Sequence, residues 1–272
     1  MRKRSFLLMG PIAILLLASS ALGQVLEPIV YTVRFPEPGK SEARVEAVVP
    51  TGRQPAVELM MPIWTPGYYR IENYASRLSS FSARTPDGKM LKFEQHQKNR
   101  WRVETGGAPA LNLSYQVLCN NRSVTGNWVG KDLLILNGGP TFMTLVEKAK
   151  RPHVVRLELP NGWNSSMSGL DLTQGGKPNH YVAADYDTLV DCPIMAGPLA
   201  INEFDVGESK HYVVAGGDTA PWDGKRAAAD LKKIVEENNR FWGALPFRKY
   251  VFLFSLREKG GRGGLNMPIP PS

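Results

Sequence analysis

The feature that most restricts the fold is a regular alternation of short apolar runs and turn residues between positions 29 and 204. The runs are rich in β-branched and aromatic residues, and several alternate apolar with polar positions, which is the period of a half-buried strand. We expect strands over 29–35, 43–49, 56–61, 101–103, 111–118, 133–136 and 154–159, with proline and glycine clusters between them. This pattern predicts a mainly β domain, built as a β-sandwich or a related multi-sheet fold.

The period changes near residue 220, where apolar residues begin to recur every three or four positions. Ala227, Leu231, Ile234, Val235, Phe241 and Trp242 follow this spacing. It predicts an amphipathic helix that ends at Gly243, followed by a buried strand over 250–256. We therefore place a domain boundary near residue 205, with a β-rich N-terminal domain over 24–204 and the start of a second domain over 205–272.

The first residues have the composition of an export signal. Three basic residues at positions 2–4 precede an apolar run over 6–17, and small residues at 21 and 23 come before Gln24. The run contains Pro11 and is shorter than the roughly 20 residues that cross a bilayer, so we expect no permanent membrane anchor. The sequence therefore predicts a signal peptide over 1–23 and an exported protein, periplasmic or extracellular.

Charge and cysteine content say less about function. The formal net charge of +8 falls to +5 when the three basic residues of the signal peptide are removed. So modest a charge, spread along the chain, does not predict a nucleic-acid partner, which would need clustered Lys and Arg on one face. In an exported protein, Cys119 and Cys192 form either a disulfide or two buried thiols, and their spacing favours neither.

The segment 61–69 is the most unusual part of the β region. Pro66 and Gly67 favour a type II turn, because proline fixes φ and glycine accepts a positive φ. Trp64, Tyr68 and Tyr69 flank that turn. These aromatic residues either form the wall of a binding cleft or pack a strand-end turn, and packing is the commoner role of aromatic side chains.

Other residues that could act in catalysis or bind a metal are scattered along the sequence. Asp185, Asp187 and Asp191 precede Cys192, and carboxylate clusters can bind metals or transfer protons, but capping and turn roles are favoured here. The four histidines (His96, His153, His180 and His211) are far apart, and the sequence contains no H-E-x-x-H or G-x-S-x-G motif. We expect no catalytic residue and no metal ligand in this chain.

Four segments taken in order resemble the glycyl aminopeptidase family of zinc metallopeptidases. They are 61–69, 185–197, 241–250 and the glycine-rich bend at 260–264. The resemblance implies a β-sandwich-like N-terminal domain followed by a thermolysin-like α/β peptidase domain. Of that second domain, this chain would hold only the truncated start, one helix and one strand.

In that family, a helix with the H-E-x-x-H motif supplies two zinc ligands and the general base. The resemblance therefore implies zinc and a peptide substrate for full-length relatives. For this chain it implies no cofactor and no peptidase activity of its own. Gly263, Gly264 and Leu265 match the front of the family motif G-G-L-E-H, which implies that they belong to a substrate-binding strand.

The chain departs from that motif at Asn266 and Met267, where glutamate and histidine are expected. Loss of one guanine after the Leu265 codon converts Leu-Glu-His into Leu-Asn-Met, so we expect a shifted and truncated reading frame. The nucleotide sequence beyond the stop codon tests this expectation.

Two other interpretations stay open. One is a stand-alone periplasmic module that binds a peptide or a glycan at the turn around Trp64, and the other is a gene product without a role. A self-sufficient module should bury the apolar faces of 225–242 and 250–256. A fragment should leave an apolar patch on the order of several hundred Å² exposed.

Overall fold

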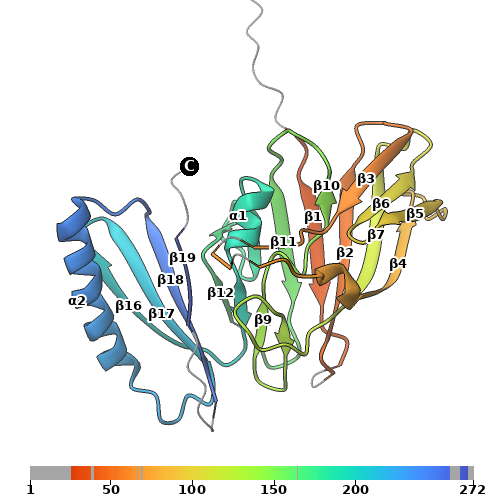
Figure 1. The fold of residues 1–272 in the computed structure, drawn as a ribbon. Helices are drawn as coiled ribbons and strands as arrows, with labels where there is room; N and C mark the ends of the chain where they lie inside the picture. Colours follow the sequence, from red (N-terminus) through yellow and green to blue (C-terminus); the bar gives the residue numbers. More distant parts are fainter. Residues whose placement is uncertain are drawn as a thin grey trace, which may run out of the picture.

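The computed structural model of the chain describes residues 26–37, 40–65, 67–68, 70–163, 165–257 and, for the backbone alone, 264–268. These residues form a mainly β protein with four sheets and two α-helices, which confirms the predicted fold class (Figure 1). The signal peptide predicted over 1–23 lies outside the described residues and stays a prediction. None of the helices in the described part is long and apolar enough to cross a membrane.

The largest sheet has seven strands in the order β13-β14-β11-β1-β2-β7-β4. Its strands are β1 (Ile29–Arg34), β2 (Glu42–Pro50), β4 (Leu78–Arg84), β7 (Ala110–Leu118), β11 (His153–Glu158), β13 (Asp171–Leu172) and β14 (His180–Ala183). β1 lies between an antiparallel neighbour, β2, and a parallel one, β11. The first strand of the chain is therefore in the interior of the sheet.

Two four-stranded sheets complete the N-terminal part. One has the order β10-β3-β6-β5 and contains β3 (Ala56–Met60), β5 (Phe93–Gln97), β6 (Arg100–Glu104) and β10 (Thr144–Leu145). The other has the order β12-β15-β9-β8 and contains β8 (Trp128–Val129), β9 (Leu134–Leu136), β12 (Ser166–Ser168) and β15 (Ile194–Ala196). A 3-10 helix, η1 (Tyr74–Arg77), and a short helix, α1 (Tyr186–Asp191), lie between strands. Each of the seven predicted strands is present.

One apolar core joins these sheets. In β1 the side chains of Ile29, Tyr31 and Val33 alternate with half-buried ones and are fully buried. The Tyr31 hydroxyl donates to the Met143 carbonyl oxygen at 2.6 Å, and the Tyr115 hydroxyl donates to the Thr141 carbonyl oxygen at 2.8 Å. These bonds satisfy two hydroxyls that would otherwise be costly to bury.

The fourth sheet has the order β16-β17-β18-β19 and contains β16 (Ala200–Val206), β17 (Ser209–Gly217), β18 (Lys249–Leu256) and β19 (Gly264–Pro268). β17 and β18 are parallel, and helix α2 (Gly224–Trp242) connects them, as a parallel pair requires. In Figure 1, α2 lies on the side of this sheet away from the N-terminal sheets. The domain boundary predicted near residue 205 stays a prediction, and the fourth sheet begins at Ala200.

Helix α2 confirms both the predicted helix and its predicted end. Asp223 caps its start, where the side chain accepts a hydrogen bond from the Arg226 N–H at 3.0 Å. At its end, Gly243 has a φ of 79° and donates its N–H to the Asn239 carbonyl oxygen at 2.9 Å. A left-handed residue at this position favours glycine because glycine has no Cβ.

Candidate functional site

Successive side chains of the fourth sheet point to opposite faces, so the sheet has two surfaces with different surroundings. One face packs against the N-terminal domain. Its contacts form a buried apolar cluster of Val214, Val251 and Leu253 with Leu133, Ile135 and Met195. We call this the closed face.

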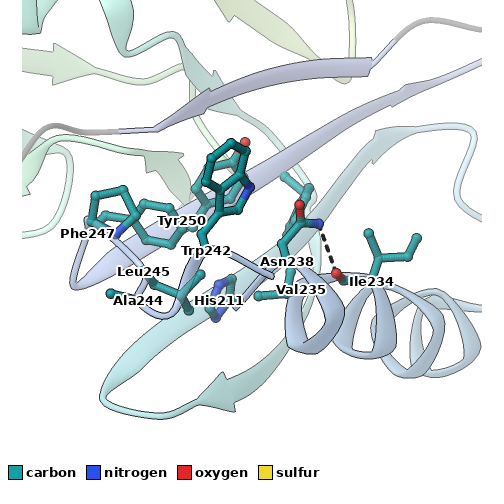
Figure 2. A pocket seen from close by; sticks show the side chains of 11 residues that line it. His211, Ile234, Val235, Asn238, Trp242, Ala244, Leu245, Phe247 and Tyr250 are labelled. Carbon is teal, nitrogen blue, oxygen red and sulfur yellow. Dashed lines mark hydrogen bonds between the residues drawn. The ribbon is translucent and has the colours of Figure 1, made fainter. Parts of the chain in front are cut away.

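The other face lies beside α2 and is only partly covered. Between α2 and strands β17 and β18 there is a groove of about 630 Å³, whose lining includes His211, Val235, Trp242, Phe247, Tyr250 and Phe252 (Figure 2). We call it the α2–β18 groove. At and near it, Ile234 is 56 % exposed, Trp242 is 74 % exposed and Phe241 is 78 % exposed. The groove therefore presents large apolar side chains to solvent.

Aromatic rings form the floor of the groove. The rings of Phe204 and His211 stack with centroids 4.8 Å apart, and Tyr250 lies 4.9 Å from Phe247 and 4.8 Å from Phe252. His211 Nδ1 is 3.0 Å from the Ser209 carbonyl oxygen, while Nε2 has no partner among the described residues. Burial lowers the pKa of His211, which favours the neutral ring. The groove is suited to apolar contact and has no paired acid and base.

A second place of interest is where the N-terminal domain meets the end of β18. Arg122 Nε donates to Ser255 Oγ at 2.6 Å, and its Nη2 donates to the Leu256 carbonyl oxygen at 2.6 Å. Arg257 Nη2 donates back to the Arg122 carbonyl oxygen at 2.7 Å. The Arg122 guanidinium also lies 5.8 Å from the ring centroid of Trp128. We call this the Arg122 junction.

The junction leaves no room for a side chain at Gly217. A Cβ there would lie 2.4 Å from the Leu256 carbonyl oxygen and 2.9 Å from Arg122 Nη2. The φ of Gly217 is +92°, a conformation that other residues rarely adopt. Glycine is therefore required at this position for the close approach of Arg122 to β18.

Two of the three predicted substrate-binding residues, Gly264 and Leu265, lie on the strand paired with β18 near this junction. Gly264 and Leu265 begin β19 and pair with Phe254 and Leu253 of β18, while Gly263 lies outside the described residues. β19 is the edge strand of its sheet, and an edge strand can pair with an extended peptide. The substrate role of Gly263, Gly264 and Leu265 stays a prediction.

The turn at 65–68 has the predicted geometry. The Tyr68 N–H donates to the Thr65 carbonyl oxygen at 3.3 Å, and Gly67 has a φ of 78°, as in a type II turn. Thr65 is buried against Gly139, whereas Trp64 is 50 % exposed. A buried threonine holds this turn in place, and Pro66 and Tyr69 lie outside the described residues.

Helix α1 explains the carboxylates that precede Cys192. Asp185 caps the helix, accepting hydrogen bonds from the Thr188 N–H at 2.9 Å and from its hydroxyl at 2.7 Å, which confirms the predicted capping role. Asp187 lies in the first turn of the same helix. At its end, burial raises the pKa of Asp191, and Asp187 and Asp185 raise it further. The sequence did not distinguish Asp191 from its neighbours.

The two cysteines are free thiols, so of the two interpretations left open the structure favours buried thiols over a disulfide. Burial raises the pKa of Cys119 and of Cys192 to about 12 in each case. Thiols with so high a pKa are poor nucleophiles at neutral pH. Neither cysteine is a catalytic candidate.

The described residues contain no group of three or more His, Cys, Asp or Glu that could hold a metal ion. His96 lies 3.1 Å from a Glu58 carboxylate oxygen on the surface, and His153 lies 3.1 Å from the Thr144 hydroxyl in the core. The zinc of the resembling family therefore does not fit the residues of this part of the chain.

Comparison with protein families and solved structures gives one family match. The Peptidase M61 N-terminal domain matches residues 30–198. Among solved structures, an aminopeptidase N family protein from Idiomarina loihiensis has 26 % sequence identity and a TM-score of 0.78, over 88 % of this chain and 40 % of that chain. Comparison with curated protein sequences gave no match.

A second solved structure is an M1 zinc metallopeptidase from Deinococcus radiodurans, a mutant bound to a Tyr-Ser-Ala substrate. It has 14 % identity and a TM-score of 0.48, over 88 % of this chain and 57 % of that chain. This chain therefore spans 40 % and 57 % of the lengths of the two solved proteins.

Proposed function

The chain belongs to the peptidase M61 family, and from that premise we propose that it is part of an exported zinc aminopeptidase of the glycyl aminopeptidase type. In this proposal the sheets of 24–204 form the N-terminal domain. The elements over 205–272 are the first of a peptidase domain and carry a substrate-binding strand. The zinc ligands and the general base come from other parts of the complete enzyme.

The observation that carries the proposal is the α2–β18 groove. Phe241 and Trp242 are mostly exposed at the end of α2, and each aromatic side chain can bury roughly 150–250 Å². Soluble monomers seldom expose an apolar patch of several hundred Å² unless another surface covers it. This degree of exposure supports an interface with the rest of a peptidase domain. It argues against a self-sufficient module, in which the apolar face of α2 would be buried.

We expect the purified chain to have no peptidase activity. The test measures zinc content by elemental analysis and turnover with glycyl and alanyl chromogenic amides after incubation with excess zinc. We expect no stoichiometric zinc and no turnover above a sample treated with a chelator. One zinc ion per chain together with zinc-dependent turnover would overturn this part of the proposal.

Export is tested separately. When the chain is expressed in a bacterium with its own N-terminus, we expect a periplasmic product that begins at Gln24. Substitution of Gly23 by leucine removes the small residue that signal peptidase requires and should leave the product uncleaved. A full-length product that stays in the cytoplasm in both cases would contradict export.

The alternative function, a peptide- or glycan-binding module, has one observation in its favour. Trp64 is half exposed directly before a turn that buried Thr65 holds in place, and exposed tryptophan rings are enriched at binding surfaces. Substitution of Trp64 by alanine should then abolish ligand binding without loss of stability. Binding that is retained in this variant would remove the support for the module.

A further inference from the structure

The Arg122 junction contains two cations and no described carboxylate partner. Among the residues that the structure describes, Arg122 and Arg257 donate only to neutral oxygens, those of Ser255, of Leu256 and of the Arg122 main chain. A guanidinium has five N–H donors. Nε and one donor of Nη2 on Arg122 are used in these bonds, and three donors remain.

The two positive charges of the junction repel each other. Partial burial lowers the pKa of Arg122, and the positive charge of Arg257 lowers it further, while Asp132 is too distant to form an ion pair and opposes the shift only weakly. Partly buried charges are normally paired, because the removal of a charge from water is costly. Two guanidiniums with unused donors would be stabilised by a carboxylate or another planar anion, which their forked geometry matches.

The position of the junction indicates which anion. Ser255 and Leu256 directly follow Phe254, and Phe254 pairs with Gly264 at the start of β19. The two guanidiniums therefore lie at the end of the β18–β19 ladder that carries the predicted substrate-binding residues. Trp128 under the Arg122 guanidinium and the bare backbone at Gly217 hold Arg122 in this position.

We propose that Arg122 and Arg257 form a carboxylate-binding site for the C-terminus of a short peptide that lies along β19. The inference rests on the proposed function, because it assigns the peptide to the Gly264–Leu265 strand. It adds a substrate class that nothing else in the chain indicates: peptides short enough for their free carboxylate to reach the junction. The N-terminal domain, through Arg122, would then contribute directly to the choice of substrate.

The test compares triglycine with triglycinamide on the purified chain, followed by NMR of the arginine Nε–Hε signals. We expect triglycine to shift the Arg122 and Arg257 signals, with binding that weakens as salt is added, and triglycinamide to leave these signals unchanged. The R257Q variant should bind triglycine about tenfold more weakly, because a charge-assisted hydrogen bond is lost. Acetate distinguishes a peptide site from a site for any carboxylate, and acetate affinity equal to that of triglycine would overturn the peptide assignment.

Arg77 supplies the matched control, because its guanidinium donates to Asn120 Oδ1 at 3.1 Å in the same region but outside the junction. The R77Q variant should bind triglycine with the same affinity as the unmodified chain. The R122K variant keeps the charge but loses the fork, and it should weaken binding; its thermal stability is measured alongside, because it also loses a hydrogen bond to the end of β18. If the R122K variant does not fold, the R257Q variant alone tests the site, because Arg257 is exposed and its substitution should not prevent folding. Equal shifts with triglycine and triglycinamide, or no shift with either, would overturn the site. The proposed function would stand or fall separately, on zinc content and turnover.

Discussion

The two faces of the fourth sheet are both rich in apolar side chains but differ in what covers them. On the closed face, Val214, Val251 and Leu253 pack against three side chains of the N-terminal domain and are at most 5 % exposed. On the other face, α2 covers only part of the sheet and leaves the α2–β18 groove open. The difference shows that this sheet is anchored on one side, while its other side presents large apolar side chains to solvent.

The largest effect should come from a cavity in the closed face. The change of Leu253 to alanine should lower the free energy of unfolding by about 2–5 kcal/mol, because Leu253 is buried between the fourth sheet and the N-terminal sheets. The matched change on the open side, Ile234 to alanine, should cost within about 0.5 kcal/mol, since Ile234 is mostly exposed. Urea unfolding of both variants measures the difference. Equal losses would show that the two faces are equally packed.

A second prediction compares how His153, in the N-terminal core, and His211, below the groove, affect the pH dependence of stability. Burial lowers the pKa of His153 to about 4, and the nearby Arg151 charge also lowers it, from an ordinary value near 6.5. Because the folded state disfavours the protonated ring, the stability that neutral His153 contributes is present above pH 6.5. It is lost as the pH falls from 6.5 toward 4, by on the order of 3 kcal/mol.

Urea unfolding at pH 7, 5.5 and 4.5 measures this loss. The His153-to-glutamine variant should be less stable at pH 7 but should lose less stability on acidification. Burial also lowers the pKa of His211, so the His211-to-glutamine variant should flatten the same profile in the same direction. A His153 variant with the pH profile of the unmodified chain would contradict the assignment of the titrating group.

A third prediction concerns the surface of the groove. The double change of Phe241 and Trp242 to serine should alter the free energy of unfolding by less than about 1 kcal/mol, because both rings are mostly exposed. It should, however, reduce the binding of a hydrophobic dye and any self-association, both measured at equal protein concentration. The unmodified chain is the reference. Dye binding unchanged by the substitutions would show that the groove is not the exposed apolar surface.

The smallest effect is expected at the two cysteines, which are buried in the core of the N-terminal sheets and not on the closed face. A reducing agent should not change the unfolding midpoint, because Cys119 and Cys192 are free thiols. Both should react with an alkylating agent only as fast as the protein opens, given their burial and raised pKa. Rapid alkylation of either thiol in the folded protein would show that the core around it opens more easily than the closed face.

Local signals predicted the elements well, because each depends on a short stretch of chain. The strand segments follow from apolar alternation, the end of α2 from Gly243, and the capping role of Asp185 from its residue type, although the sequence did not predict the short helix α1 itself. The family assignment was also accessible, since it rests on four short motifs in order and the family match to residues 30–198 confirms it.

The junction could not be predicted in the same way. Arg122 and Ser255 are 133 positions apart, and nothing in the local sequence of either marks the contact. The same holds for Gly217, which the sequence shows only as one of many glycines, and for Asp191, whose partial burial raises its pKa. The sequence left open whether the apolar face of α2 is buried or exposed. Helix periodicity predicts where that face lies, but its exposure depends on the elements that pack nearby.

The pairing of β1 has a consequence for how the protein reaches its folded state. β1 needs β11 as its parallel neighbour, and Tyr31 in β1 lies beside Val155 in β11, so the central sheet cannot close until most of the N-terminal domain has been synthesised. Contacts between such distant segments make folding slow. The core of the N-terminal sheets therefore forms in a late and cooperative step, after the residues of β11 have left the ribosome.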